Sequence, residues 1–90
     1  MLEIVPSNRF KKDLKLALRR GYNMELLATV VNKLAEGIPL EPKYKDHELS
    51  GDFKGLRECH ISPDWLLIYQ VIDGEIVLYL SRTGTHSDLF

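Results

Sequence analysis

The segment Trp65–Ile72 constrains the fold of this chain more than any other stretch. Its sequence, WLLIYQVI, is apolar on both faces and rich in β-branched and aromatic residues, which favour strands. The segment is also too short for a typical buried helix. A strand with two apolar faces must be covered on both, so we predict that this segment is the central strand of a sheet.

Turn signals on both sides of this segment predict a three-stranded antiparallel meander. Ser62-Pro63-Asp64 predicts a tight turn because proline fixes φ, and Asp73-Gly74 is a strong signal for a two-residue hairpin loop. We therefore expect strands at about residues 54–61, 65–72 and 75–82.

The first part of the chain predicts a strand followed by two helices. Residues 2–5 form a short strand that Pro6 ends. Ser7 is a good N-cap for one helix, and Asn23 is a good N-cap for a second helix that Gly37 ends. The short link between them predicts an antiparallel helical hairpin. The apolar residues at helical spacing are Phe10, Leu14, Ala17 and Leu18, then Leu27, Val30, Val31 and Leu34.

Together these elements predict one α+β domain over residues 1–90. It consists of a short N-terminal strand, an antiparallel helical hairpin and a three-stranded antiparallel meander. Residues 38–53 are expected to form a loop, and loops of this length are usually functional or disordered. The run Tyr44-Lys45-Asp46-His47 within it does not have a disordered composition.

The composition excludes several classes of protein. A single cysteine, Cys59, cannot form an internal disulfide, so no oxidising compartment is required. The N-terminal residues lack the basic and apolar regions of a signal peptide, and no run approaches the ~18 apolar residues of a membrane-spanning helix. We therefore expect a cytoplasmic protein that does not contact a membrane.

The net charge of −1 conceals an uneven distribution. Residues 1–20 carry six basic and two acidic side chains, a net charge of +4, whereas the remaining residues carry a net charge of −5. The first helix is therefore a basic face on a mildly acidic body. Such a face is explained equally well as solvated helix surface and as a region that attracts a phosphate backbone.

Several chemically competent side chains are predicted to converge at one end of the sheet. If Asp73 and Gly74 are the only loop residues of their hairpin, Trp65 faces Arg82, within ~5.5 Å at Cβ. The preceding turn then places His60 on the other flank of Trp65. The predicted set is His60, Asp64, Trp65 and Arg82, with His86 and Phe90 following at the end of the chain.

This set suits the cleavage of RNA through its own 2′-hydroxyl. That reaction needs a base for the hydroxyl, an acid for the leaving 5′-oxygen and positive charge beside the phosphate. Histidine can serve in both proton transfers near neutral pH, and the arginine fork binds two phosphate oxygens. An aromatic ring can hold an unstacked base.

The motifs of the second half of the chain, taken together, resemble the YafQ-like branch of the RelE/ParE superfamily of toxins. They are Tyr44-Lys45-Asp46-His47, Lys54-Gly55, His60 with Pro63-Asp64-Trp65, Leu67-Ile68-Tyr69, Arg82-Thr83-Gly84-Thr85-His86 and Leu89-Phe90. The first half is similar in layout and length only. The combination is specific, although each piece alone is weak.

The resemblance implies a small sheet backed by a helical hairpin and an endoribonuclease that needs no cofactor and no metal. Such a toxin cleaves mRNA on the translating ribosome, by transesterification to a 2′,3′-cyclic phosphate, and so inhibits translation and growth. The implied catalytic residues are His47, His60, Asp64, Arg82 and His86, and the implied substrate-binding residues are Trp65, Phe90 and Arg82.

The resemblance also implies a protein partner. Such toxins are held in check by a cognate antitoxin, in a toxin–antitoxin complex that is expected to be oligomeric and to bind operator DNA through the antitoxin. The antitoxin is expected to be acidic where it covers either the basic first helix or the histidine cluster.

Each of these residues also fits a plainer role. His47 alone is more typical of an ordinary loop histidine, and His60 with Asp64 fits a hydrogen bond that braces a turn. Trp65 and Phe90 fit the core, and Arg82 fits an ion pair with Asp64. Three histidines and an aspartate also form a zinc-binding set, although no two ligands have the close spacing of a zinc finger.

A different class of function remains open within the same superfamily. It contains toxins that bind and poison DNA gyrase without cutting RNA, and such a binding protein does not need the histidines for chemistry. The sequence pI of about 6.3 also departs from the basic character that is usual for RNA-cutting toxins.

Overall fold

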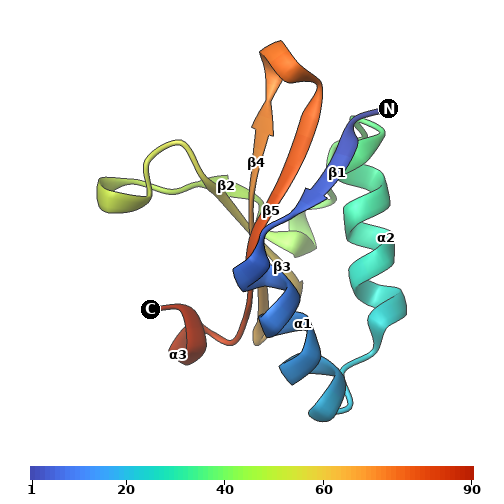
Figure 1. Ribbon diagram of the computed structural model, residues 1–90, viewed down its shortest axis with the longest axis vertical. Coiled ribbons are helices and arrows are strands. Elements are labelled where there is room, and N and C mark those ends of the chain that lie inside the picture. Colours follow the sequence, from blue (N-terminus) through green and yellow to red (C-terminus); the bar gives the residue numbers. More distant parts are fainter.

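The chain forms a five-stranded sheet with two helices packed against one face (Figure 1). The computed structural model describes the backbone of residues 1–90 and every side chain except that of Asp73. The strands are β1 (Glu3–Pro6), β2 (His47–Glu48), β3 (Arg57–Ser62), β4 (Trp65–Ile72) and β5 (Val77–Gly84). The helices are α1 (Asn8–Arg19), α2 (Met24–Ala35), α3 (His86–Leu89) and the 3₁₀ turns η1 (Pro42–Tyr44), η2 (Gly51–Phe53) and η3 (Asp73–Glu75).

Both predicted helix N-caps are confirmed. The Ser7 hydroxyl accepts a hydrogen bond from the Phe10 amide at 2.9 Å, and the Asn23 side chain accepts one from the Glu25 amide at 3.0 Å. The chain descends through α1 and returns through α2, as a helical hairpin should (Figure 1). No helix is long and apolar enough to cross a bilayer in the part of the chain that the structure describes.

The sheet order β1-β5-β4-β3-β2 confirms that β4 is the central strand. β3, β4 and β5 form the predicted antiparallel meander. β1 adds to the outer edge of β5 in parallel, in a register that ends with Pro6 opposite Leu80. The last four residues of β5 therefore extend beyond β1, and their outer edge needs other hydrogen-bonding partners.

The predicted two-residue hairpin loop between β4 and β5 is wrong. Ile72 pairs with Val77, so four residues form the loop, and Ile76 within it has a left-handed φ of 54°. The register also shifts between Ile68 and Tyr69, and Arg82 consequently lies opposite Ile68 rather than opposite Trp65. One extra residue in β5 at this irregularity and two extra loop residues account for the difference.

Residues 38–53 are more ordered than the predicted loop. They contain η1 and η2 and the short strand β2, which pairs with the start of β3. β3 begins at Arg57 rather than at about residue 54. After β5 the chain forms one further helical turn, α3, which lies across the sheet from α2 (Figure 1).

The core lies between the helices and one face of the sheet, and Trp65 is part of it. The Trp65 side chain is only 3% exposed, and its ring packs 4.9 Å from that of Tyr22. The indole Nε1 donates to the Thr83 hydroxyl at 2.8 Å, which in turn donates to the Leu66 carbonyl at 2.7 Å. Thr83 thereby satisfies two buried polar groups of β4.

Cys59 lies on the same face, fully buried in β3 opposite Leu67. Burial raises the pKa of the Cys59 thiol to about 12, because the thiolate would lose its hydration. Cys59 is therefore an unreactive core residue at neutral pH, as its place in an apolar strand predicts.

We predict that Thr83→Val destabilises the protein although it preserves side-chain volume. It leaves the buried Trp65 N–H without an acceptor, which should lower the free energy of unfolding by about 1–3 kcal/mol. Urea denaturation measures this, with Thr29→Val as the control, since the Thr29 hydroxyl lies on the exposed surface of α2. Equal losses in the two variants would contradict the structural role of Thr83.

Candidate active site

The strand register aligns polar residues in a row across the face of the sheet that points away from the core. His47 of β2 pairs with Glu58 of β3, Glu58 with Ile68 of β4, and Ile68 with Arg82 of β5. Directly paired residues share a face, so one row carries an imidazole, a carboxylate and a guanidinium. The row spans three strand spacings, roughly 14 Å between its end backbones.

A second row runs beside the first one. His60 pairs with Leu66, and Leu66 pairs with Gly84, where β5 ends. Gly84 has a φ of 157°, and a Cβ there would lie 2.9 Å from the Asp88 carboxylate of α3. Glycine thus allows the chain to turn directly into α3, which begins with His86. His60 lies at one end of this row, and His86 follows two residues after Gly84 at the other end.

Glu58 is the residue that joins two of the histidines. Its Oε1 lies 3.6 Å from His47 Nε2 and 3.7 Å from His60 Nε2, and the Glu58 side chain is largely buried. Both distances exceed those of direct hydrogen bonds but allow strong attraction to a protonated imidazole. One buried carboxylate therefore orients two imidazoles on the same face.

The position of His47 is set by the loop before β2. Its Nδ1 lies 2.7 Å from the Lys45 carbonyl, which can only accept, so Nδ1 carries a hydrogen. The nitrogen that is free to exchange a proton is then Nε2, which faces Glu58. The tautomer and the ring orientation follow from this backbone contact.

Asp46 fixes the same loop to the sheet. It accepts hydrogen bonds from the Tyr69 hydroxyl and, at 3.1 Å, from the Arg57 guanidinium, which itself donates to the Tyr69 oxygen at 3.3 Å. Burial, followed by the hydrogen bond to Asp46, raises the pKa of Tyr69 above its usual value, so the hydroxyl remains a donor. This network is a rigid support beneath His47.

Arg82 is held by a residue of α1 that the sequence analysis did not identify. Asp13 accepts from Arg82 Nε at 2.7 Å and from Nη2 at 3.0 Å, in a bidentate pair. The hydrogen bond to Asp13 raises the pKa of Arg82, so the charge is secure. Two of the five guanidinium hydrogens are used, which leaves the others for a ligand.

His86 and Phe90 are placed by the anchoring of α3. Thr85 and Asp88 form a reciprocal capping box, and Asp88 accepts from Arg20, the C-cap residue of α1, at 2.6 and 3.1 Å. The Arg20 guanidinium holds the pKa of Asp88 well below its usual range. His86 and Phe90 are both exposed, with ring centroids 5.1 Å apart.

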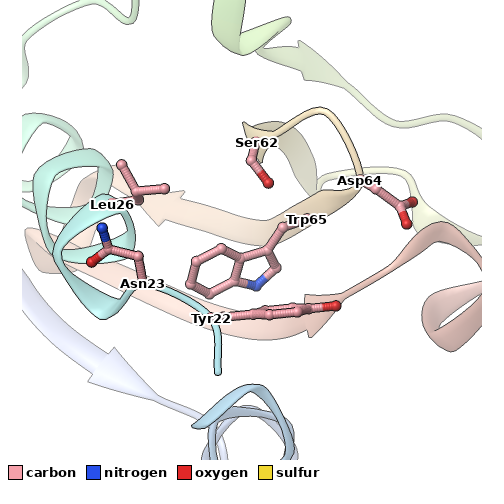
Figure 2. A pocket seen from close by; sticks show the side chains of 6 residues that line it. All are labelled: Tyr22, Asn23, Leu26, Ser62, Asp64 and Trp65. Atoms are coloured by element: carbon pink, nitrogen blue, oxygen red, sulfur yellow. The ribbon is translucent and has the colours of Figure 1, made fainter. Parts of the chain in front are cut away.

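Trp65 lies in the core instead of on this face. Its ring is therefore not open to a substrate base in this structure, and its substrate-binding role stays a prediction. Figure 2 shows the indole against Tyr22 at a shallow pocket of about 300 Å³, with the exposed Asp64 carboxylate directed away from both rings. Arg82 pairs with Asp13 rather than with Asp64.

A separate cavity of about 410 Å³ opens at the edge of β3 beside His60. Lys43, Tyr44 and Lys45 line it together with His60, so one side of this histidine faces a basic surface. Among the described side chains, no group of three or more histidines, cysteines and carboxylates is arranged to hold a metal ion.

The α+β fold and the polar face agree with what the resemblance to small bacterial toxins implies. The family model described as "Bacterial toxin of type II toxin-antitoxin system, YafQ" matches residues 2–90, and the chain belongs to this family.

Relatives agree over the full length of the chain. It is 43% identical to the mRNA interferase toxin YafQ of Escherichia coli K12, over 98% of this chain and 95% of that protein. A metal-bound toxin from Helicobacter pylori has 51% identity and a TM-score of 0.95, with both chains fully covered. YafQ in the E. coli DinJ-YafQ toxin-antitoxin complex has 42% identity and a TM-score of 0.89, covering 99% of this chain and 97% of that one.

We predict strong coupling between Asp13 and Arg82. Their side chains are only 11% and 24% exposed, so a double-mutant cycle with Asp13→Ala and Arg82→Ala should give a coupling energy of about 1.5–3 kcal/mol in urea denaturation. The cycle cancels the bond from the Thr83 amide to Asp13, which both Asp13 variants lack. A value of about 0.5 kcal/mol or less, typical of an exposed pair, would contradict the clamp.

Proposed function

We propose that this protein is a toxin endoribonuclease that cleaves mRNA by attack of the substrate's 2′-hydroxyl on the adjacent phosphate. The bond from phosphorus to the 5′-oxygen breaks, leaving a 2′,3′-cyclic phosphate and a 5′-hydroxyl. The observation that carries this proposal is the alignment of His47, Glu58 and Arg82 in one row, with His60 in the neighbouring row. Membership of the YafQ toxin family supports the same reaction.

Arg82 supplies positive charge for the phosphate. Asp13 uses its Nε and one Nη2 hydrogen, and the remaining hydrogens can donate to phosphate oxygens as negative charge grows on them. The clamp also fixes the guanidinium before substrate arrives, so little orientation is lost on binding. Arg82 therefore acts as a preorganised electrostatic group.

The histidines provide the two proton transfers. His60, oriented by Glu58, and His86, at the start of α3, approach the phosphate from opposite sides of the floor formed by Leu66 and Gly84. One removes the 2′-hydroxyl proton and the other protonates the 5′-oxygen. His47, which shares Glu58 with His60, assists in the proton transfer on that side of the phosphate. Asp64, exposed at the adjacent turn, is a further proton carrier.

The setting of this reaction follows from the family. We propose that the mRNA is cut on the translating ribosome and that a cognate antitoxin blocks the toxin, by analogy with the E. coli DinJ-YafQ complex. The exposed lysines of α1, Lys11, Lys12 and Lys15, offer a surface to acidic segments of that partner.

We predict that His86→Ala lowers the single-turnover rate of mRNA cleavage on ribosomes by roughly 10²–10⁴, as the loss of a proton-transfer group should. The melting temperature should change little, because His86 is exposed. Ser87→Ala, one residue further along the same exposed turn, is the matched control and should cleave normally. If His86→Ala cleaves within about threefold of the wild-type rate, too small a loss for a catalytic group, the assignment fails.

We predict further that EDTA leaves cleavage unchanged, because the proposed protons and charges all come from side chains. A similar toxin from H. pylori is described as metal-bound, so chelation tests directly whether this protein needs a metal for cleavage. Chelation should be checked with ribosomes that remain assembled in sufficient Mg²⁺ after the toxin alone has been treated and desalted. Loss of activity that added metal restores would contradict the metal-independent mechanism.

We predict that reversing Lys11, Lys12 and Lys15 to glutamate slows association with the antitoxin. Charge at the periphery of an interface acts mainly on the association rate, so the effect should be largest at low ionic strength and small at high salt. Stopped-flow mixing measures this rate. An unchanged association rate at low ionic strength would place the antitoxin on another surface.

A further inference from the structure

Two exposed phenylalanines from distant parts of the chain meet beside His86. Phe53 at the end of η2 is 39% exposed, Phe90 is 50% exposed, and their ring centroids lie 5.2 Å apart at an angle of 74°. The His86 ring packs 5.1 Å from Phe90 on the same cluster. We call Phe53, His86 and Phe90 the aromatic cluster.

Both arms of the aromatic cluster rest on anchored turns. Phe90 is carried by α3, which the capping box and the Arg20 ion pair fix to the body of the protein. Phe53 is carried by η2, where its carbonyl accepts from the Leu56 amide at 3.0 Å, and the Leu49 amide donates to the Leu56 carbonyl at 2.9 Å. The two rings are therefore presented by ordered backbone on both sides.

The geometry leaves flat apolar surface open to solvent. An angle of 74° sets one ring edge-on to the other, so the edge-on ring keeps its faces clear of that contact. Neighbouring exposed aromatic rings at a surface mark a binding site more often than isolated ones do. Phe90 packs against two rings of the cluster, those of Phe53 and His86, whereas Phe53 packs against the Phe90 ring.

The charges around Phe53 indicate which part of a nucleotide it would bind. Asp52 and Lys54, its two chain neighbours, are exposed and of opposite sign, so they give no net attraction for a phosphate. An unstacked nucleobase needs only a flat apolar partner, and base–aromatic stacking is largely independent of base identity. The site therefore suits a base rather than the backbone.

We propose that Phe53 and Phe90 form a stacking site for one unstacked nucleobase next to the scissile phosphate. The proposal deepens the nuclease function proposed above and rests on it for the identity of the ligand as RNA. Phe53 is in this view a substrate-binding residue, which holds the base beside His86 so that the phosphate lies within its reach.

The test compares Phe53→Leu with Phe53→Trp, because leucine keeps apolar volume and only tryptophan keeps an aromatic face. Phe53→Leu should raise the half-saturating substrate concentration in single-turnover cleavage about tenfold, a typical cost for one lost stacking contact. The maximal rate should stay within about threefold of wild type, since His86 and Arg82 remain in place. Phe53→Trp should restore wild-type affinity, and Ile38→Ala, at an exposed apolar residue elsewhere, should behave as wild type.

A binding measurement separates this proposal from the proposed function. A short DNA single strand containing 2-aminopurine lacks the 2′-hydroxyl and cannot be cleaved, and its fluorescence falls when the base stacks. Weaker binding and quenching by Phe53→Leu, rescued by Phe53→Trp, support the stacking site even if wild type proves unable to cleave RNA. Equal binding and equal quenching by wild type and Phe53→Leu overturn it, even if the protein is a nuclease.

Discussion

The carboxylate of Asp13 is the interaction on which the polar face of this protein depends. β1 covers the outer edge of β5 only as far as Leu80, and beyond it the strand needs other partners. Ser7 donates to the Ser81 carbonyl at 2.7 Å, and Asp13 accepts from the Thr83 amide at 3.1 Å while it grips Arg82. The first turns of α1 thus replace the missing strand with side chains. These side chains satisfy the free backbone hydrogen-bonding groups of β5 and also orient the Arg82 guanidinium.

The elements of this fold were predictable because each has a local cause. Apolar residues on both faces identified β4 as the central strand, and Ser7 and Asn23 identified the helix starts. The register was not predictable, because Asp73-Gly74 signals a turn without fixing its length. The four-residue loop and the irregularity between Ile68 and Tyr69 each displace the pairing, and a displaced register changes which side chains meet. The parallel addition of β1 has no local signal at all.

In the candidate site, too, the features with a local signal were predictable from the sequence and those that depend on tertiary pairing were not. The histidines and Arg82 were identified by residue type and resemblance, but their contacts depend on tertiary pairing. Glu58 was missed although Glu58 and His60 are two apart in a strand and therefore share a face. That signal was available in the sequence. Asp13 offered none, because an aspartate in a basic helix reads as ordinary solvated surface until β5 is placed beside it. The burial of Trp65 had no local signal, because it depends on the Thr83 hydroxyl that accepts its N–H in the core.

Because Cys59 is buried, the rate at which its thiol is labelled reports how often the core of this protein opens. The thiol is the only one in the chain, is fully buried in β3 and stays protonated at neutral pH. A maleimide or disulfide reagent can therefore react only when the core between the sheet and the helices opens. At high reagent concentration, the labelling rate becomes the rate of that opening. Mass spectrometry of timed samples would read this rate in the intact toxin and in its complexes without any engineered probe.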